Sequence, residues 1–171
     1  MRDATPSAIY LKDYRQPDYL IDTVDLEFDL QEGLTKVTSH MQVRRRKGVS
    51  ASAEMVLDGQ EIELVSVSVD DIARAADSYS VNDDQLVLGS LPERFKLETI
   101  CIIRPELNTK LEGLYKSGSM YCTQCEAEGF RRITYFLDRP DIMARFSTRI
   151  IADKIDFPIL LSNGNLVDSG E

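Results

Sequence analysis

The sequence has a single histidine, His40, and this scarcity excludes most sites that depend on imidazole. Neither a zinc site with two histidines nor an HExxH motif can be built from one histidine. A Ser-His-Asp triad would have to use His40. That residue falls on the polar side of residues 37–43, where apolar and polar side chains alternate as in a half-buried strand. We therefore interpret His40 as a solvated strand residue and not as a catalytic one.

Basic residues are also scarce, with 20 Lys and Arg against 29 Asp and Glu, a net charge of −9 and a pI near 4.7. Binding to nucleic acid requires a cationic surface that displaces counterions from the phosphates. Anionic membrane surfaces attract basic segments for a similar reason. No apolar run approaches the ~20 residues of a membrane-spanning helix. We expect neither nucleic acid nor membrane as a partner.

The three cysteines, an odd number, do not form a disulfide framework. No apolar run follows the charge in residues 1–6, so a signal peptide is not expected. Both observations favour a reducing cytoplasmic location.

Cys122 and Cys125 form a CxxC motif. A zinc site would need four ligands, and only Cys101 and His40 remain to complete it. A redox pair of the thioredoxin type needs a βαβ context, which the strand-like pattern of this chain does not provide. We expect two small buried thiols in a strand or tight turn, and no metal ligands in this chain.

The chain does contain a strongly period-two hydrophobic pattern. Its 171 residues are 43% hydrophobic and 29% charged, enough for one domain that needs no disulfide or metal to hold its core. Turn residues recur every eight to twelve positions, as is typical of β-sandwiches. Strands are predicted at residues 24–30, 37–43, 65–69, 86–88, 95–101, 149–152 and 159–161. The first two should form a hairpin. We predict an all-β fold, an antiparallel sandwich or saddle-like multi-sheet domain spanning residues 1–171.

One short helix is predicted at residues 139–146. Asp138 would be its N-cap, followed by an early proline, Pro140, and an acid at the third helical position.

The region around this predicted helix has an unusual charge balance. Residues 126–149 hold five arginines and four acids, a net charge of +1, so the rest of the chain carries −10. Arginines without lysines favour planar, bidentate ion pairs. We expect such ion pairs to hold this region against the sheet.

Residues 123–141 (TQCEAEGFRRITYFLDRPD) resemble a signature block of the bacterial aminopeptidase N family, zinc-dependent alanyl aminopeptidases of the HExxH gluzincin type. Residues 10–14 and 157–165 resemble the same family. The chain also stops a few residues after the turn at 163–165, where a returning strand should follow. The resemblance implies an N-terminal β-domain of a longer, multidomain zinc aminopeptidase. Its zinc ligands and catalytic residues would lie beyond Glu171, so this fragment alone should be inactive.

The resemblance further implies that Gln124 and Glu126 bind the substrate. In that family, residues at these positions reach the active site, where the glutamate accepts the free α-ammonium of a peptide and the glutamine lines the pocket for the first side chain. An exopeptidase must recognise one positive charge at a chain end, and a desolvated carboxylate does so through a charge-assisted bond. In an extended segment Gln124, Glu126 and Glu128 face the same side. Spacing alone does not choose between the two acids, whereas the family motif assigns the amine to Glu126.

Two alternatives remain open from the sequence. A free-standing β-sandwich module for carbohydrate or protein would usually display exposed aromatics, but there is no tryptophan and aromatics total only 8%. A related epoxide hydrolase would share the Gln-x-Glu pair. For the leading interpretation the implied partners are a peptide N-terminus and the catalytic domain, in a protein expected to be monomeric.

Overall fold

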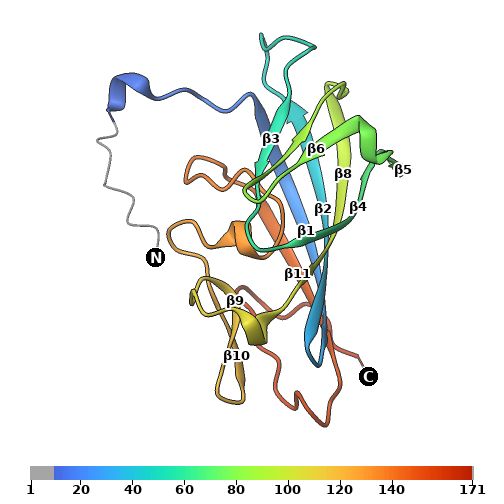
Figure 1. The fold of residues 1–171 in the computed structure, drawn as a ribbon, viewed down its shortest axis with the longest axis vertical. Coiled ribbons are helices and arrows are strands. Elements are labelled where there is room, and N and C mark those ends of the chain that lie inside the picture. Colours follow the sequence, from blue (N-terminus) through green and yellow to red (C-terminus); the bar gives the residue numbers. More distant parts are fainter. Residues whose placement is uncertain (1–9, 171) are drawn as a thin grey trace.

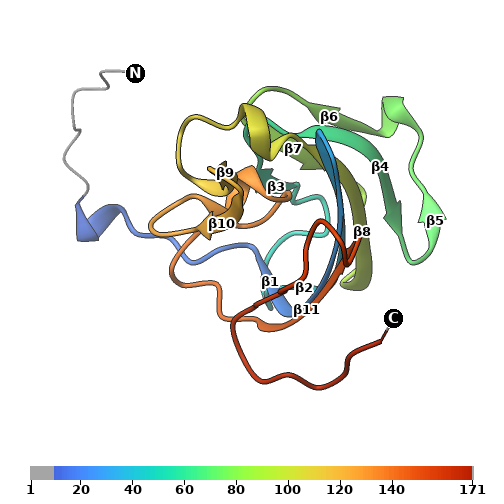
Figure 2. The same ribbon diagram turned by 90° about the horizontal axis from the view of Figure 1, so that it is seen from below.

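The computed structural model describes residues 10–170, in which eleven strands form three sheets (Figures 1 and 2). The prediction about a signal peptide in residues 1–6 lies outside this range. The six-stranded sheet, ordered β11-β1-β2-β8-β4-β5, consists of β11 (Arg145–Ala152), β1 (Tyr19–Gln31), β2 (Leu34–Arg45), β8 (Arg94–Ile103), β4 (Glu63–Val69) and β5 (Ile72–Ala73). The three-stranded sheet consists of β3 (Met55–Asp58), β7 (Gln85–Leu88) and β6 (Tyr79–Val81). The third sheet is the hairpin of β9 (Gly113–Ser117) and β10 (Met120–Gln124). The all-β prediction is confirmed.

The predicted hairpin is the centre of the six-stranded sheet. β1 and β2 pair in an antiparallel register that brings Val24 opposite Met41, and Gly33 turns the chain between them with a φ of 78°. Only glycine adopts such a φ without cost. The ladders are antiparallel except for β11, which runs parallel to β1 along the edge of the sheet. Pairing between strands so distant in sequence cannot be read from a hydrophobic pattern.

The core lies between the six-stranded sheet and the segments that cover one of its faces. Alternate residues of β1, β2 and β8 are buried, as the period of two requires. The covering segments are the three-stranded sheet and residues 133–137, whose Tyr135 is only 2% exposed. Cys101 points into this core, where burial raises the pKa of its thiol to about 11. His40 lies on the opposite, polar face of the strand, as predicted. It is only partly exposed there, and its Nε2 is 2.6 Å from Oε2 of Glu98.

The predicted helix at residues 139–146 is wrong. Residues 139–141 form only a turn, and β11 begins inside the predicted range. Two competing interactions explain the difference. The carboxylate of Asp138, expected to cap the helix, accepts bonds from the backbone N–H and Nε of Arg131 instead. Asp141, expected in the first helical turn, is held by the guanidinium of Arg139 at 2.7 Å. Pairing of the following residues with β1 then favours an extended chain.

The helices of residues 10–170 are four 3-10 turns of three residues each: η1 (Leu11–Asp13), η2 (Ala76–Ser78), η3 (Pro105–Leu107) and η4 (Phe130–Arg132). Within these described residues no helix is long and apolar enough to cross a membrane. The strand predicted at residues 149–152 is the second half of β11. The strand predicted at 159–161 does not form: these residues have no regular secondary structure.

Candidate functional site

The candidate site lies at the end of the β9–β10 hairpin, where the chain leaves β10 and turns through residues 125–129 into η4. Figure 2 shows the hairpin and η4 on the same side of the six-stranded sheet as β3. Gln124 is the last residue of β10 and pairs with Gly113 of β9. The N–H of Gly129 donates to the carbonyl oxygen of Cys125 at 2.8 Å and closes the turn. We call residues 125–129 the acidic loop, because it carries Glu126 and Glu128.

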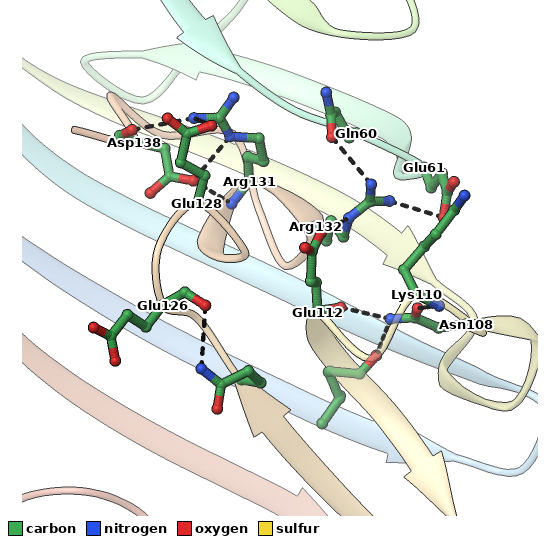
Figure 3. Close-up of polar contacts among 12 residues, drawn as sticks. Gln60, Glu61, Asn108, Lys110, Glu112, Glu126, Glu128, Arg131, Arg132 and Asp138 are labelled. Carbon is green, nitrogen blue, oxygen red and sulfur yellow. Dashed lines mark hydrogen bonds and ion pairs between the residues drawn. The ribbon is translucent and has the colours of Figure 1, made fainter. Parts of the chain in front are cut away.

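The structure brings Gln124 and Glu126 together. Nε2 of Gln124 donates to the backbone carbonyl oxygen of Glu126 at 3.2 Å, and both side chains are exposed. The carboxylate of Glu126 has no hydrogen-bond or ion-pair partner among residues 10–170. In Figure 3 it points away from the neighbouring arginines. The carboxylate is therefore free to accept a cation from outside the chain.

Glu128 differs from Glu126 in this respect. Its Oε2 lies 3.3 Å from Nη2 of Arg131, and Figure 3 shows its side chain directed toward Arg131 and Asp138. Sequence spacing could not distinguish the two glutamates, but their surroundings do. Glu128 is already paired with a cation of the chain itself, whereas Glu126 has no such partner in the part of the chain that the structure describes.

Arg131 connects the acidic loop to the core. Its Nε lies 3.0 Å from Oδ2 of Asp138, and the two side chains are only 16% and 10% exposed. The backbone N–H of Asp138 in turn donates to Oδ2 of Asp58, at the end of β3. Burial raises the pKa of the Asp58 carboxyl, and the positive charge of Arg131 opposes that shift. The arginine thus compensates two acids that have lost much of their hydration.

Arg132 holds the other side of the loop. Its guanidinium contacts Glu61 at 2.9 Å, Glu112 at 3.1 Å and the side-chain oxygen of Gln60 at 3.2 Å. Together with the pair between Arg139 and Asp141, these contacts confirm the predicted ion pairs. The partners of Arg132 were missed from the sequence. They lie on other elements, and no local motif links them to the arginine.

The two cysteines of the CxxC motif are not both buried as predicted. Cys122 is half-buried in β10, and Cys125 is exposed directly after the strand. Positions three apart in an extended chain point to opposite faces. The two thiols therefore do not face one another as a redox pair or as two ligands of one metal ion would require.

The residues present do not fit a zinc ion. Among residues 10–170 no group of three or more histidine, cysteine, aspartate or glutamate side chains is arranged to hold a metal. Cys101 points into the core and His40 lies on the opposite face of the sheet.

A first prediction follows for the isolated chain. Isothermal titration of the 171-residue protein with ZnCl2 should detect no stoichiometric site of submicromolar affinity, because no three ligands converge anywhere in residues 10–170. Tight binding that disappears in the Cys122→Ser, Cys125→Ser double variant would contradict this interpretation of the CxxC motif.

Comparison with known proteins gives consistent matches. The family model described as Peptidase M1 N-terminal domain matches residues 14–171. Aminopeptidase N of Escherichia coli is 52% identical over 166 residues, which cover 97% of this chain and 19% of the relative. Aminopeptidase N of Caulobacter vibrioides is 48% identical over 170 residues, 99% of this chain and 19% of the relative. The chain thus spans about a fifth of the length of these relatives.

Solved structures agree with the sequence matches. The crystal structure of Legionella pneumophila aminopeptidase A in complex with aspartic acid superposes with a TM-score of 0.85 and 34% identity, covering 92% of this chain and 19% of that one. Native yeast LTA4 hydrolase superposes with a TM-score of 0.64 over 78% of this chain and 23% of that one, at 16% identity. At that identity the likeness concerns the fold alone.

Proposed function

Because the chain belongs to the Peptidase M1 N-terminal domain family, we propose that it is the substrate-anchoring domain of a zinc aminopeptidase that removes N-terminal residues from peptides. The proposal is supported by a difference between the two glutamates of the acidic loop. Among the described residues the carboxylate of Glu126, next to Gln124, has no partner, while the neighbouring Glu128 pairs with Arg131. The loop therefore offers one free negative charge at a defined position.

In this proposal Glu126 accepts the α-ammonium of the substrate and Gln124 lines the pocket for the first side chain. A free peptide N-terminus differs from an internal amide by one positive charge. In a site closed to water, a carboxylate forms a strong charge-assisted bond with that ammonium. An internal peptide would leave the carboxylate buried and unpaired, which costs free energy and rejects the wrong substrate. Gln124 supports this position through its bond to the Glu126 carbonyl oxygen.

The remaining parts of the activity belong to the complete protein. Zinc, held by residues outside this chain, would supply Lewis-acid chemistry at the scissile carbonyl when bound. This chain would pack against the catalytic domain and direct the acidic loop toward it. We further propose a monomeric cytoplasmic enzyme, with peptide N-termini as substrates and no nucleic acid or membrane as partners. No observation favours the free-standing binding module or the epoxide hydrolase over this function.

The test begins with the coding sequence after Glu171, which should encode HExxH followed by a downstream glutamate. The complete protein should then hydrolyse alanine p-nitroanilide but not its N-acetyl derivative, since acetylation removes the ammonium that Glu126 is proposed to bind. The 171-residue chain alone should hydrolyse neither. Equal hydrolysis of the two substrates by the complete protein would contradict the proposed role of the acidic loop.

A further inference from the structure

Two glycines bring the backbone at both ends of the acidic loop into direct contact. A Cβ atom at Gly129 would lie 2.4 Å from the carbonyl oxygen of Gln124, 3.0 Å from the amide nitrogen of Gly113 and 3.2 Å from Cα of Cys125. All three neighbours are backbone atoms, so none can move aside by changing a rotamer. Gly129 itself has a φ of −83°, which any residue adopts. Space, and not backbone conformation, requires glycine at this position.

Gly113 completes the contact from the opposite side. It has a φ of 71°, and a Cβ atom there would lie 2.7 Å from Cβ of Arg132 and 3.2 Å from the carbonyl oxygen of Gly129. Gly113 is also the residue of β9 that pairs with Gln124. The N–H of Arg132 donates to the Gly129 oxygen at 3.1 Å. The strand end before the loop and the turn after it are thus packed together without intervening side chains.

We propose that this contact between Gly113 and Gly129 positions the Glu126 carboxylate for the substrate ammonium, so that Gly129 is a positioning residue of the amine-binding site. The inference rests on the proposed function. A methyl group at residue 129 must move the Gln124 carbonyl or the loop by roughly 1 Å to reach an ordinary contact distance. A displacement of that size is enough to cost a charged contact on the order of 10²-fold. Contacts to parts of the substrate other than the ammonium should be weakened less.

The experiment compares two competitive inhibitors of the complete protein that differ only in the amine: leucine hydroxamate and its desamino analogue, 4-methylpentanohydroxamic acid. In Gly129→Ala the inhibition constant of leucine hydroxamate should rise at least about 10-fold. That of the desamino analogue should rise several-fold less, since it makes no bond to Glu126 and can lose only the contact of its side chain with Gln124. The ratio of the two constants does not depend on the folded fraction, so a general loss of stability does not change it. Gly89→Ala is the matched control, because a Cβ atom at Gly89 meets nothing within 4 Å, and it should leave the ratio unchanged.

The same ratio measured with Glu126→Ala tests whether Gly129 acts through that residue. In the Glu126→Ala background, Gly129→Ala should produce no further change in the ratio, because residues acting through one contact are not additive. An unchanged ratio in Gly129→Ala, or an equal loss for both inhibitors, would overturn the inference while leaving the proposed function intact if Glu126→Ala changes the ratio. If Glu126→Ala leaves the ratio unchanged, the proposed function fails and the inference fails with it. Should Gly129→Ala give no folded protein, Gly113→Ala is measured in its place, with the same outcomes for and against.

Discussion

Replacing Glu126 by alanine in the complete protein is expected to lower kcat/KM for alanine p-nitroanilide by about 10²-fold. Truncating one partner of a buried, hydrogen-bonded charge pair costs about 2–5 kcal/mol. The resemblance to the aminopeptidase N family implies that a glutamate of the catalytic domain, in that family's Gly-Ala-Met-Glu-Asn motif, shares the ammonium, so the loss should fall toward the lower part of that range. Since about 1.4 kcal/mol corresponds to a factor of ten, the expected decrease is of order 10².

Most of this loss should appear as a raised KM. The ammonium is present in the ground state and in the transition state, so removing its partner weakens both. A smaller part should appear in kcat, because the ammonium contact also sets where the scissile carbonyl lies. Steady-state kinetics with Glu126→Ala and the isosteric Glu126→Gln separate charge from shape. Glu126→Gln should recover little of the lost kcat/KM, since glutamine keeps the volume of the side chain but not its negative charge.

Glu128→Ala is the matched control, since the same side-chain type is removed from the same loop. Glu128 is 69% exposed and pairs with Arg131 at 3.3 Å. An exposed pair of this kind contributes about 0–1 kcal/mol to stability. We expect kcat/KM of this variant to stay within about twofold of the unmodified enzyme. A variant that loses turnover at Glu128 while Glu126→Ala stays near normal would show that the amine is bound by the other glutamate.

The sequence predicts the parts of the fold that depend on local pattern. Alternation along β1, β2 and β8 predicts strands because one face of each is buried, and Gly33 marks the hairpin turn between the first two. The helix at residues 139–146 was predicted from capping residues, which are a local signal. It does not form because Arg131 takes the carboxylate of Asp138 and β11 pairs with β1. The pairing of β11 with β1 joins residues far apart in the chain, so no local window of sequence contains it. Arg131 and Asp138 are only seven residues apart, but capping preferences alone do not show that the arginine takes this carboxylate.

The residues of the candidate site, too, could be predicted from the sequence only in part. The resemblance named Gln124 and Glu126, but the period of two alone could not exclude Glu128. The distinction comes from Arg131, which pairs with Glu128 and leaves Glu126 free. The need for glycine at residue 129 was equally hidden. It arises from a backbone approach between a strand end and a turn, and the sequence shows only one more glycine in a loop.

Arg131→Ala is expected to destabilise the 171-residue chain by about 3 kcal/mol at pH 7, measured by urea unfolding. Breaking a buried ion pair by removing one partner leaves the other charge uncompensated, which costs about 3–5 kcal/mol. Here Arg131 is 16% and Asp138 10% exposed, which places the expected cost at the lower end of that range. The matched control is Arg149→Ala. Its guanidinium is 74% exposed and 3.6 Å from Glu27, so the change should be at most about 0.5 kcal/mol.

The destabilisation by Arg131→Ala should depend on pH, and Asp58 determines the direction. Burial raises the pKa of Asp58 in the folded chain above its ordinary value, while the positive charge of Arg131 opposes that shift. An acid with a raised folded pKa favours the folded state below its unfolded pKa, and that contribution is lost as pH rises through the folded pKa. Removing Arg131 raises the pKa of Asp58 in the folded chain further. The variant therefore loses more folding stability at neutral pH than the unmodified chain does. The stability difference between the unmodified chain and Arg131→Ala should therefore be largest at pH 7 and narrow as the pH falls toward 4. A difference that is constant over this range would mean that Arg131 stabilises the chain by packing, and that its charge does not compensate Asp58.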